Sequence, residues 1–163
     1  MSMKYSLVLA MLLPILSWSQ NCNVRTTRDP YTKEMKVSTG FFSLNSARAS
    51  IEATKSDIDF MFEVEGKCFD DGSNAAVFFE GARLKSNFKN TGTMNCDGLF
   101  HFTFRNTNPS PTALQNLGSK KITSIRFKDN SGKETGVSFT PAQQQQFMDL
   151  VNCVINEAKK LVQ

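Results

Sequence analysis

Histidine and tryptophan are almost absent from this sequence. His101 is the only histidine, and the single tryptophan, Trp18, lies near the N-terminus. The sequence contains neither an H-E-x-x-H zinc motif nor a G-x-S-x-G nucleophile elbow, and it has no glycine-rich phosphate loop. The sequence therefore has none of the usual signatures of zinc proteases, serine hydrolases and nucleotide-binding enzymes.

A strong excess of one charge is also lacking. The 163 residues carry 19 basic and 15 acidic side chains, which gives a net charge of +4. This charge is too thinly spread for the dense basic footprint of a nucleic-acid-binding protein. The hydrophobic content of 40% and the charged content of 21% are those of an ordinary globular chain, and the length suits one domain.

Apolar runs long enough to cross a membrane are lacking as well. The longest run, residues 7–16, is about half of the roughly 20 residues that a bilayer requires. Lys4 precedes this run, and the residues Ser17-Trp18-Ser19 follow it in a small-x-small pattern. A positive start, a short apolar run and small residues after it are typical of a secretory signal.

We therefore predict a cleaved signal peptide over residues 1–19 and an exported domain over residues 20–163. Lipid attachment at Cys22 is the competing interpretation, but residues 19–21 lack the aliphatic side chain that a lipidation signal needs. The exported domain is expected in the periplasm or outside the cell, with no membrane span.

Four cysteines follow the predicted signal: Cys22, Cys68, Cys96 and Cys153. An even number of cysteines in an exported chain is typical of disulfides, so we predict two. No C-x-x-C pair occurs, which disfavours a metal site, and we expect no metal or other cofactor. Three pairings are possible, and the sequence leaves them open. Each disulfide would close a long loop and contribute about 3–5 kcal/mol to stability.

Hydrophobic and polar residues alternate with a period of two through much of the chain, which is typical of half-buried strands. In residues 99–105, phenylalanines share one face and His101 lies on the other. The predicted strands are 36–44, 49–54, 57–65, 77–79, 82–89, 99–105, 122–128 and 134–139. Because the alternation is one-sided, we expect an antiparallel sheet with one face on a core.

Turn residues separate several of these strands. Glu80-Gly81 predicts a two-residue hairpin, and residues 129–132 predict a second hairpin with a longer loop. All fourteen phenylalanines follow residue 19 and are expected to fill the core. Sugar-binding surfaces favour tryptophan and tyrosine instead, because their rings also carry a polar group.

Two segments have helix signals. Ser110-Pro111 is expected to begin a short helix that ends at Gly118. A second helix is predicted from residues 140–143, which match the capping box. Its apolar stripe consists of Phe147, Leu150, Val151, Val154, Ile155, Ala158, Leu161 and Val162. Cys153 lies off this stripe, so its disulfide is expected to reach a loop or strand end beside the helix.

These elements predict an α+β fold in a single domain. We expect an antiparallel sheet of about six to eight strands, which can curl toward a sandwich or half-barrel. The C-terminal amphipathic helix is expected to pack on one face of this sheet.

Several short motifs carry a resemblance to known proteins. They are the Ser19-Gln20 junction, Lys67-Cys68, Asn95-Cys96 before a phenylalanine-rich strand, the leucine and isoleucine pattern of residues 114–126, and Cys153. With these motifs, the chain resembles small exported proteins of unknown function from Bacteroidetes-type bacteria over residues 29–156. The resemblance implies an exported single domain and carries no known activity.

His101 and the carboxylates of residues 57–65 are the candidate catalytic groups. Imidazole titrates near neutral pH and can act as a general base. Carboxylates two residues apart on a strand lie about 7 Å apart, which is comparable to the catalytic pairs of glycoside hydrolases. The pairs are Asp57 with Asp59 and Glu63 with Glu65. A solvated strand face explains the same pattern without catalysis.

Charged residues also have structural and binding interpretations. The acidic strand could pair across the sheet with Arg83, Lys85 and Lys89. Basic residues could also gather on one sheet face and attract an anionic partner, such as a glycan or a membrane surface. The basic residues concerned are Arg83, Lys85, Lys89, Lys120, Lys121, Arg126 and Lys128. The pattern shows no interleaved exposed aromatics of the kind that suggest nucleic-acid binding.

Two turn segments, residues 70–74 and 129–132, contain the oxygen ligands that calcium prefers. Neither matches the ligand spacing of a calcium-binding loop, and turn propensity explains both. No catalytic set is complete, so we expect no catalytic residues. The sequence favours a non-enzymatic binding or interaction domain with an unknown protein or glycan partner and no nucleic acid.

Two other functions remain open. One is a small envelope hydrolase that uses carboxylates and His101. The other is an inhibitor-like protein whose loop over residues 105–113 plugs a partner's site. A pocket that holds His101 beside two carboxylates would favour the hydrolase, and a rigid protruding loop would favour the inhibitor.

Overall fold

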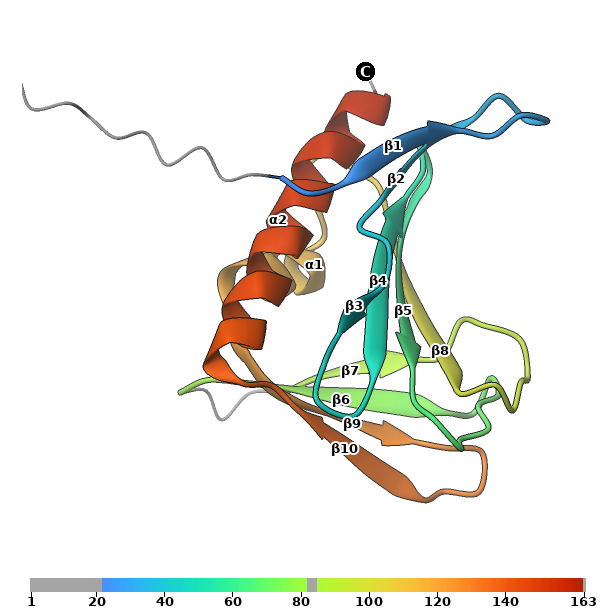
Figure 1. Ribbon diagram of the computed structural model, residues 1–163, viewed down its shortest axis with the longest axis vertical. Helices are drawn as coiled ribbons and strands as arrows, with labels where there is room; N and C mark the ends of the chain where they lie inside the picture. Colours follow the sequence, from blue (N-terminus) through green and yellow to red (C-terminus); the bar gives the residue numbers. More distant parts are fainter. Residues whose placement is uncertain (1–21, 82–84, 163) are drawn as a thin grey trace, which may run out of the picture.

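The computed structural model describes residues 22–81 and 85–162, which form two antiparallel sheets and two helices (Figure 1). The elements, in chain order, are β1 (Arg25–Arg28), β2 (Met35–Ser38), β3 (Phe42–Ser43), β4 (Arg48–Ala53), β5 (Asp57–Glu63), β6 (Asn74–Phe79), β7 (Lys85–Lys89), β8 (Leu99–Arg105), α1 (Thr112–Ser119), β9 (Ile122–Lys128), β10 (Glu134–Ser138) and α2 (Pro141–Val162). The predicted α+β class, antiparallel pairing and C-terminal helix are confirmed. The expected signal peptide over residues 1–19 lies outside the described residues.

The six-stranded sheet has the order β1-β2-β4-β5-β8, and β3 pairs with β4. Phe60 and Phe62 of β5 lie directly opposite Phe102 and Phe100 of β8. Because side chains alternate along a strand, this register turns all four rings toward the same inner face. None of the four is more than 3% exposed. The predicted alternation of β5 and β8 is therefore confirmed.

The N-terminal part of this sheet differs from the prediction. The strand expected over residues 36–44 is divided into β2 and β3, and Phe41 between them is 51% exposed. Val37 of β2 is buried. Strand β1 was not predicted, because all four of its side chains are exposed and show no alternation.

The four-stranded sheet has the order β10-β9-β6-β7. A register shift interrupts the pairing of β6 with β9, so that Phe78 lies opposite Ser124 and Phe79 lies opposite Ile122. Such a bulge reverses the alternation of side chains. Ile122 is therefore buried, although strict alternation placed it on the face opposite Ile125.

The connection from β6 to β7 also differs from the prediction. A two-residue turn at Glu80-Gly81 would place Phe78 opposite Arg83, but Phe78 pairs with Lys85. The loop between β6 and β7 is therefore two residues longer than the predicted turn. Residues 82–84 lie outside the described residues, and the described part of the strand begins at Lys85.

Helix α2 begins with the predicted capping box. The backbone N–H of Thr140 donates to Oε1 of Gln143 at 2.9 Å, and that of Gln143 donates to Oγ1 of Thr140 at 3.3 Å. Two N–H groups without helical partners are thereby satisfied. The helix packs along β2 and β4 of the six-stranded sheet. Five residues of its predicted stripe are buried, whereas Leu150 and Leu161 are half-buried and Val162 is 43% exposed.

Helix α1 begins and ends differently from the prediction. Pro111 occupies the N-cap position without a side-chain hydrogen bond, so Ser110 does not cap the helix. Gly118 lies inside the last turn, because the helix continues to Ser119. A Cβ at Gly118 would lie 2.6 Å from Oδ1 of Asn152 on α2. Glycine therefore permits the close approach of the two helices. Nδ2 of Asn152 donates a hydrogen bond to the Gly118 carbonyl and so joins them.

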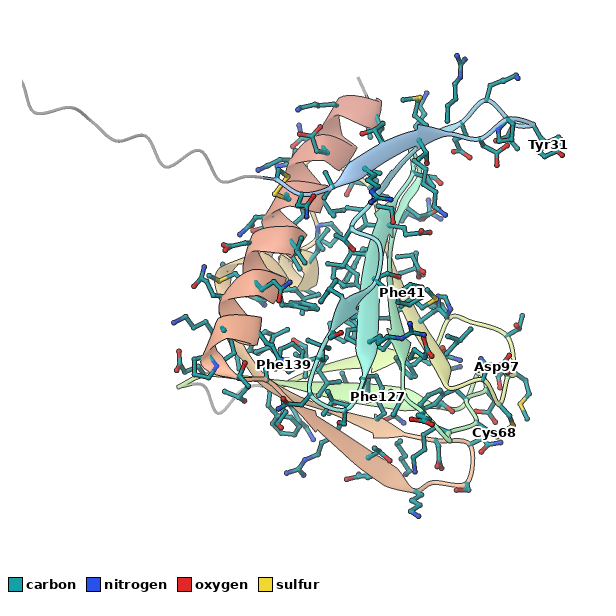
Figure 2. All side chains as sticks on the ribbon, viewed as in Figure 1. Tyr31, Phe41, Cys68, Asp97, Phe127 and Phe139 are labelled. Carbon is teal, nitrogen blue, oxygen red and sulfur yellow. A yellow bond between two sulfur atoms is a disulfide. The ribbon has the colours of Figure 1, made fainter. Side chains whose placement is uncertain are left out.

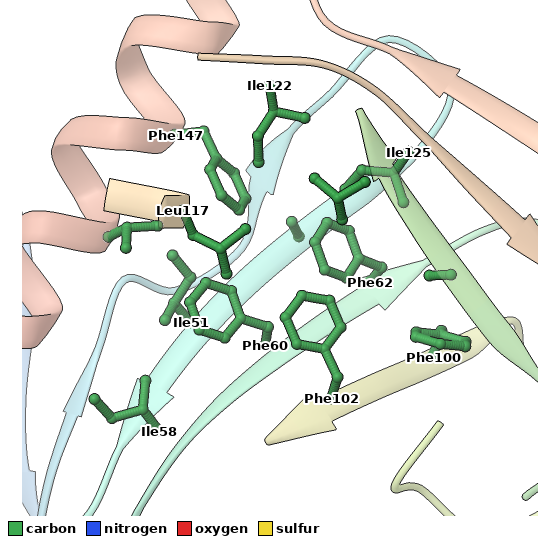
Figure 3. Close-up of a cluster of buried hydrophobic side chains, with 14 of the residues drawn as sticks. Ile51, Ile58, Phe60, Phe62, Phe100, Phe102, Leu117, Ile122, Ile125 and Phe147 are labelled. Carbon is green, nitrogen blue, oxygen red and sulfur yellow. The ribbon is translucent and has the colours of Figure 1, made fainter. Parts of the chain in front are cut away.

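Phenylalanines connect the two sheets and α2 in one core (Figure 3). The ring of Phe127 on β9 lies 5.4 Å from that of Phe62 and 5.2 Å from that of Phe100, centre to centre. Phe147 of α2 lies 6.2 Å from Phe60 and 6.3 Å from Phe62. Aromatic pairs at these separations add to the hydrophobic stabilisation of the core. The prediction that phenylalanine fills the core is confirmed for these rings.

Two disulfides pair the four cysteines. Cys22, which precedes β1, is bonded to Cys153 of α2, and Cys68 is bonded to Cys96 (Figure 2). The partner of Cys153 thus lies in a segment beside the helix, as its position off the apolar stripe predicts. Disulfides are typical of an oxidising compartment. No helix of the described residues has the length and apolar character that a membrane crossing requires.

Candidate functional site

The outer face of the four-stranded sheet carries a group of basic side chains, which we call the basic face. Its cations are Lys85 and Lys89 of β7 and Arg126 and Lys128 of β9. All four are exposed, because they alternate with the side chains that turn toward the core. In Figure 1 this sheet forms the lower layer of the molecule, and no helix lies beneath it.

The strand order places these cations in two rows. Strand β6 lies between β7 and β9, so one row of cations runs along each side of it. Neighbouring strands lie about 4.8 Å apart, which separates the two rows by about 10 Å. The residues of β6 on the same face are uncharged, and we call them the uncharged strip: Asn74, Ala76 and Phe78.

The register fixes which residues are neighbours across the basic face. Asn74 lies opposite Lys89 on one side and Lys128 on the other. Phe78 lies opposite Lys85. The guanidinium of Arg126 lies over the ring of Phe78, 4.9 Å from its centre, and the ring itself is half-buried. This cation–π contact holds Arg126 over the strip.

The charges of the basic face are not neutralised within it. None of the four cations forms an ion pair with a residue that the structure describes. Glu134 of β10, opposite Lys128, is the one acidic side chain among the described strand residues of this face. A surface of this kind has a positive potential and attracts anions.

The structure brings together four of the seven basic residues that were expected on one face. Lys120 and Lys121 lie instead in the connection between α1 and β9, where the Lys120 ammonium is 5.9 Å from the centre of the Phe79 ring. Arg83 lies outside the described residues. A basic sheet face is therefore present, and its cations come from β7 and β9.

The possible pairing of the acidic strand with Lys85 and Lys89 is wrong, and Arg83 lies outside the described residues. Strand β5 pairs with β4 and β8 in the six-stranded sheet, whereas β7 belongs to the other sheet. Glu63 of β5 forms an ion pair with Arg48 of β4 instead. Strand alternation identifies the face of a residue but not the neighbouring strand, so the sequence could not select this partner.

His101 and Asp59 form a hydrogen-bonded pair on the outer face of the six-stranded sheet. Nδ1 of His101 lies 2.9 Å from Oδ2 of Asp59, and Oδ1 of Asp59 accepts a hydrogen bond from Thr103 at 2.9 Å. The side chains of His101 and Asp59 are 26% and 32% exposed. Asp59 lies directly opposite Thr103, so His101 is its diagonal neighbour across the strands.

This pair is not part of a complete catalytic set in the described residues. Nε2 of His101 has no hydrogen bond there to a hydroxyl or thiol that could serve as a nucleophile. Surface clefts of about 660, 520 and 340 Å³ lie elsewhere. The largest of these three is lined by residues 43–48 with Glu63 and Glu65. His101 thus contacts one carboxylate, and none of these three clefts surrounds the pair.

The two acidic turns that were considered for calcium use their carboxylates internally. Oδ1 of Asp70 accepts hydrogen bonds from the N–H groups of Gly72 and Ser73. Oδ1 of Asp129 accepts from the hydroxyl of Ser131 at 2.7 Å and from its N–H at 3.0 Å. The Ser131 hydroxyl bond is the main cause that lowers the pKa of Asp129. Within the described residues, no three histidine, cysteine, aspartate or glutamate side chains gather where they could hold a metal ion.

The loop that projects from the molecule is not the loop of residues 105–113, which the inhibitor-like alternative requires to protrude. Residues 105–113 are held to the body through Asn106, whereas the hairpin of β1 and β2 extends outward (Figures 1 and 2). Tyr31 at its tip is 92% exposed. The N–H groups of Tyr31 and Thr32 donate to Oδ1 of Asp29, each at 2.8 Å. The Asp-Pro dipeptide at this tip is a turn signal that could have indicated the hairpin.

No family model, curated protein or solved structure matches the chain. The resemblance to small exported proteins of Bacteroidetes-type bacteria therefore stays a prediction.

Proposed function

We propose that this protein is an exported, non-enzymatic domain that binds an anionic partner, either a protein or a glycan, through its basic face. The observation that carries the proposal is the exposure of four cations on one sheet face, with no ion-pair partner among the described residues. Complementary charge steers the encounter of partners and raises the rate of association. The basic face supplies that charge on a rigid sheet.

Two features support export to the periplasm or to the outside of the cell. Residues 1–19 have the positive start, short apolar run and small-x-small end of a signal peptide. The two disulfides are typical of proteins outside the reducing cytoplasm. N-terminal sequencing of the protein recovered from the periplasm or medium is expected to begin near Gln20. Recovery of intact Met1 from the cytoplasm would reject export.

The binding proposal is tested with the mature protein and a panel of soluble polymers. The panel contains polygalacturonate, heparin and polyglutamate as anionic polymers and dextran as a neutral one. At about 0.15 M salt, where the Debye length is about 8 Å, at least one anionic polymer is expected to bind more tightly than dextran. This affinity should fall as salt rises. The matched variant replaces the four cations of the basic face with glutamine and is expected to bind at least a hundredfold more weakly.

Two outcomes would reject the proposal. If the wild-type protein binds none of the anionic polymers more tightly than dextran, the basic face does not function as an anion-binding surface. If the glutamine variant binds as tightly as the wild type, the anion is bound elsewhere. Circular dichroism of both proteins shows whether the substitutions leave the fold intact.

A small hydrolase is the second candidate function, and the contact of 2.9 Å between His101 and Asp59 favours it. A carboxylate orients an imidazole and stabilises its protonated form, which general-base catalysis uses. Wild-type protein and His101→Ala are compared on panels of esters and glycans. Turnover that falls about a hundredfold or more in His101→Ala would support the hydrolase. No turnover by the wild type rejects it.

A further inference from the structure

The uncharged strip of β6 and the cations on both sides of it favour one kind of ligand. We infer that the basic face binds a linear anionic polysaccharide, whose chain lies along β6 and contacts the β7 cations on one side and the β9 cations on the other. This inference rests on the proposed function and adds the class and the direction of the ligand. The inference depends on one arrangement, in which a row of uncharged residues lies between two rows of cations.

The extent of the basic face favours a polymer over a single small anion. From Asn74 to Phe78 the uncharged strip measures about 13 Å, because each strand residue spans about 3.3 Å. Lys89 and Lys128 flank its Asn74 end, and Lys85 flanks its Phe78 end. The strand backbones of the two rows are also about 10 Å apart, and the Arg126 guanidinium reaches over the Phe78 end of the strip. One carboxylate, sulfate or phosphate cannot contact all four cations, whereas a chain with repeated anionic groups can.

The same face favours a sugar chain over single-stranded nucleic acid. Proteins that bind single strands stack successive bases on exposed aromatic rings. Phe78 is the one aromatic ring among the described residues of this face, and the guanidinium of Arg126 lies over it. Asn74 and Asn87 are exposed on the same face. Their amides can both donate to and accept from sugar hydroxyls. Charge and hydrogen bonds would therefore hold an acidic sugar chain here, in place of the tryptophan and tyrosine rings that sugar-binding surfaces favour.

A lipid surface fits the basic face less well. Peripheral membrane proteins combine cations with exposed apolar side chains that insert into the bilayer. Phe78 is the one large apolar side chain among the described strand residues of this face, and it is half-buried. The basic face therefore offers charge and hydrogen-bonding groups, as a hydrated sugar polymer requires, without an apolar anchor.

Titration with a polygalacturonate oligosaccharide at about 0.15 M salt tests the two rows separately. Each row variant removes two of the four cations and is expected to weaken binding at least tenfold. The control variant removes the same charge from the β4–β5 turn and from α2, and it is expected to change the affinity less than threefold. The β7 variant is Lys85→Gln/Lys89→Gln, the β9 variant is Arg126→Gln/Lys128→Gln, and the control is Lys55→Gln/Lys160→Gln.

A third substitution tests whether the chain occupies the uncharged strip. Ala76→Phe leaves every charge in place but puts a bulky ring between the two rows. We expect it to weaken oligosaccharide binding at least tenfold, while circular dichroism and the Tm show that the fold is retained. If Ala76→Phe binds the oligosaccharide as tightly as the wild type does, the chain does not lie on β6 and the inference is overturned.

The other outcomes separate this inference from the proposed function. If one row variant binds like the wild type, the ligand does not lie between the rows, although the protein still binds anions. If single-stranded oligodeoxythymidylate or anionic phospholipid vesicles bind tenfold more tightly than the oligosaccharide, the ligand class is wrong. If the wild type binds no anionic probe at all, the proposed function fails with the inference.

Discussion

The side-chain amide of Asn106 donates a hydrogen bond to the carbonyl oxygen of Ala158 at 2.9 Å. The same amide donates to the carbonyl oxygen of Thr54, also at 2.9 Å. Asn106 is 7% exposed, so water has little access to these groups. One side chain thus joins the end of β8 to the β4–β5 turn and to the C-terminal part of α2.

Asn106→Ala is expected to lower the free energy of unfolding by about 1–3 kcal/mol, because one buried and one partly buried carbonyl lose the Asn106 donor. Urea denaturation of the purified protein measures this change. The control is Asn87→Ala, at an exposed position of β7, with an expected change of no more than about 0.5 kcal/mol. Equal stabilities of the two variants would contradict the role of Asn106.

Gly98→Ala is expected to destabilise the protein strongly. Gly98 has a φ of 77°, and a Cβ there would lie 2.2 Å from the carbonyl oxygen of Val64. The backbone strain alone is of order 1–3 kcal/mol, and the clash adds to it. Thermal unfolding is compared with Gly136→Ala, where nothing lies within 4 Å of the added Cβ. A Gly98→Ala protein as stable as the Gly136→Ala protein would show that this turn is not constrained.

The two disulfides are expected to contribute unequally to stability. Cys22 and Cys153 are 131 residues apart, and Cys68 and Cys96 are 28 apart. Loop closure in the unfolded chain then predicts contributions of about 5 and about 3.6 kcal/mol, respectively. Chemical denaturation of the two paired Cys→Ser variants measures this order. The reverse order would mean that native contacts, and not loop length, dominate the effect.

Ser131→Ala is expected to raise the pKa of Asp129 toward its ordinary value of 3.8, because the Ser131 hydroxyl is the largest cause that lowers it. The pKa of Asp29 is lowered mainly by the N–H groups of Thr32 and Tyr31 and should not change. NMR titration of both carboxylates in the two proteins tests this difference. An unchanged pKa of Asp129 would reject the assigned cause.

The sign of the pH effect follows from the direction of these pKa values. A carboxylate whose pKa is lower in the folded state stabilises the fold above its unfolded pKa. That contribution is lost as the pH falls from 3.8 through the lower folded value. Stability of the wild type should therefore decrease in this acidic range, and Ser131→Ala should decrease less steeply there.

The elements that the sequence predicted well are those with a strong local signal. Phe100 and Phe102 of β8 alternate with polar residues, and the strand is observed with the predicted bounds. Thr140 and Gln143 form the predicted capping box, because its two hydrogen bonds join residues only three positions apart. In both cases the chemistry that stabilises the element lies within the element itself.

The elements that were missed or placed wrongly depend on distant parts of the chain. Burial of Ile122 follows from a bulge opposite β6, and Gly118 lies inside α1 where that helix closely approaches Asn152 of α2. Neither position has a local signal for these contacts. The contact of His101 with Asp59 likewise depends on the pairing of β5 with β8.

The amino-acid pattern by itself determined the α+β class, most of the strand faces and the amphipathic C-terminal helix, because alternation and helical periodicity are properties of neighbouring residues. Only the tertiary structure decided which strands pair, which cysteines join, and that Lys85, Lys89, Arg126 and Lys128 flank β6 on one face. Strand pairing brings together residues that are far apart in the chain, and any two strands of similar pattern can satisfy the same alternation. The selection among them comes from the packing of the whole core.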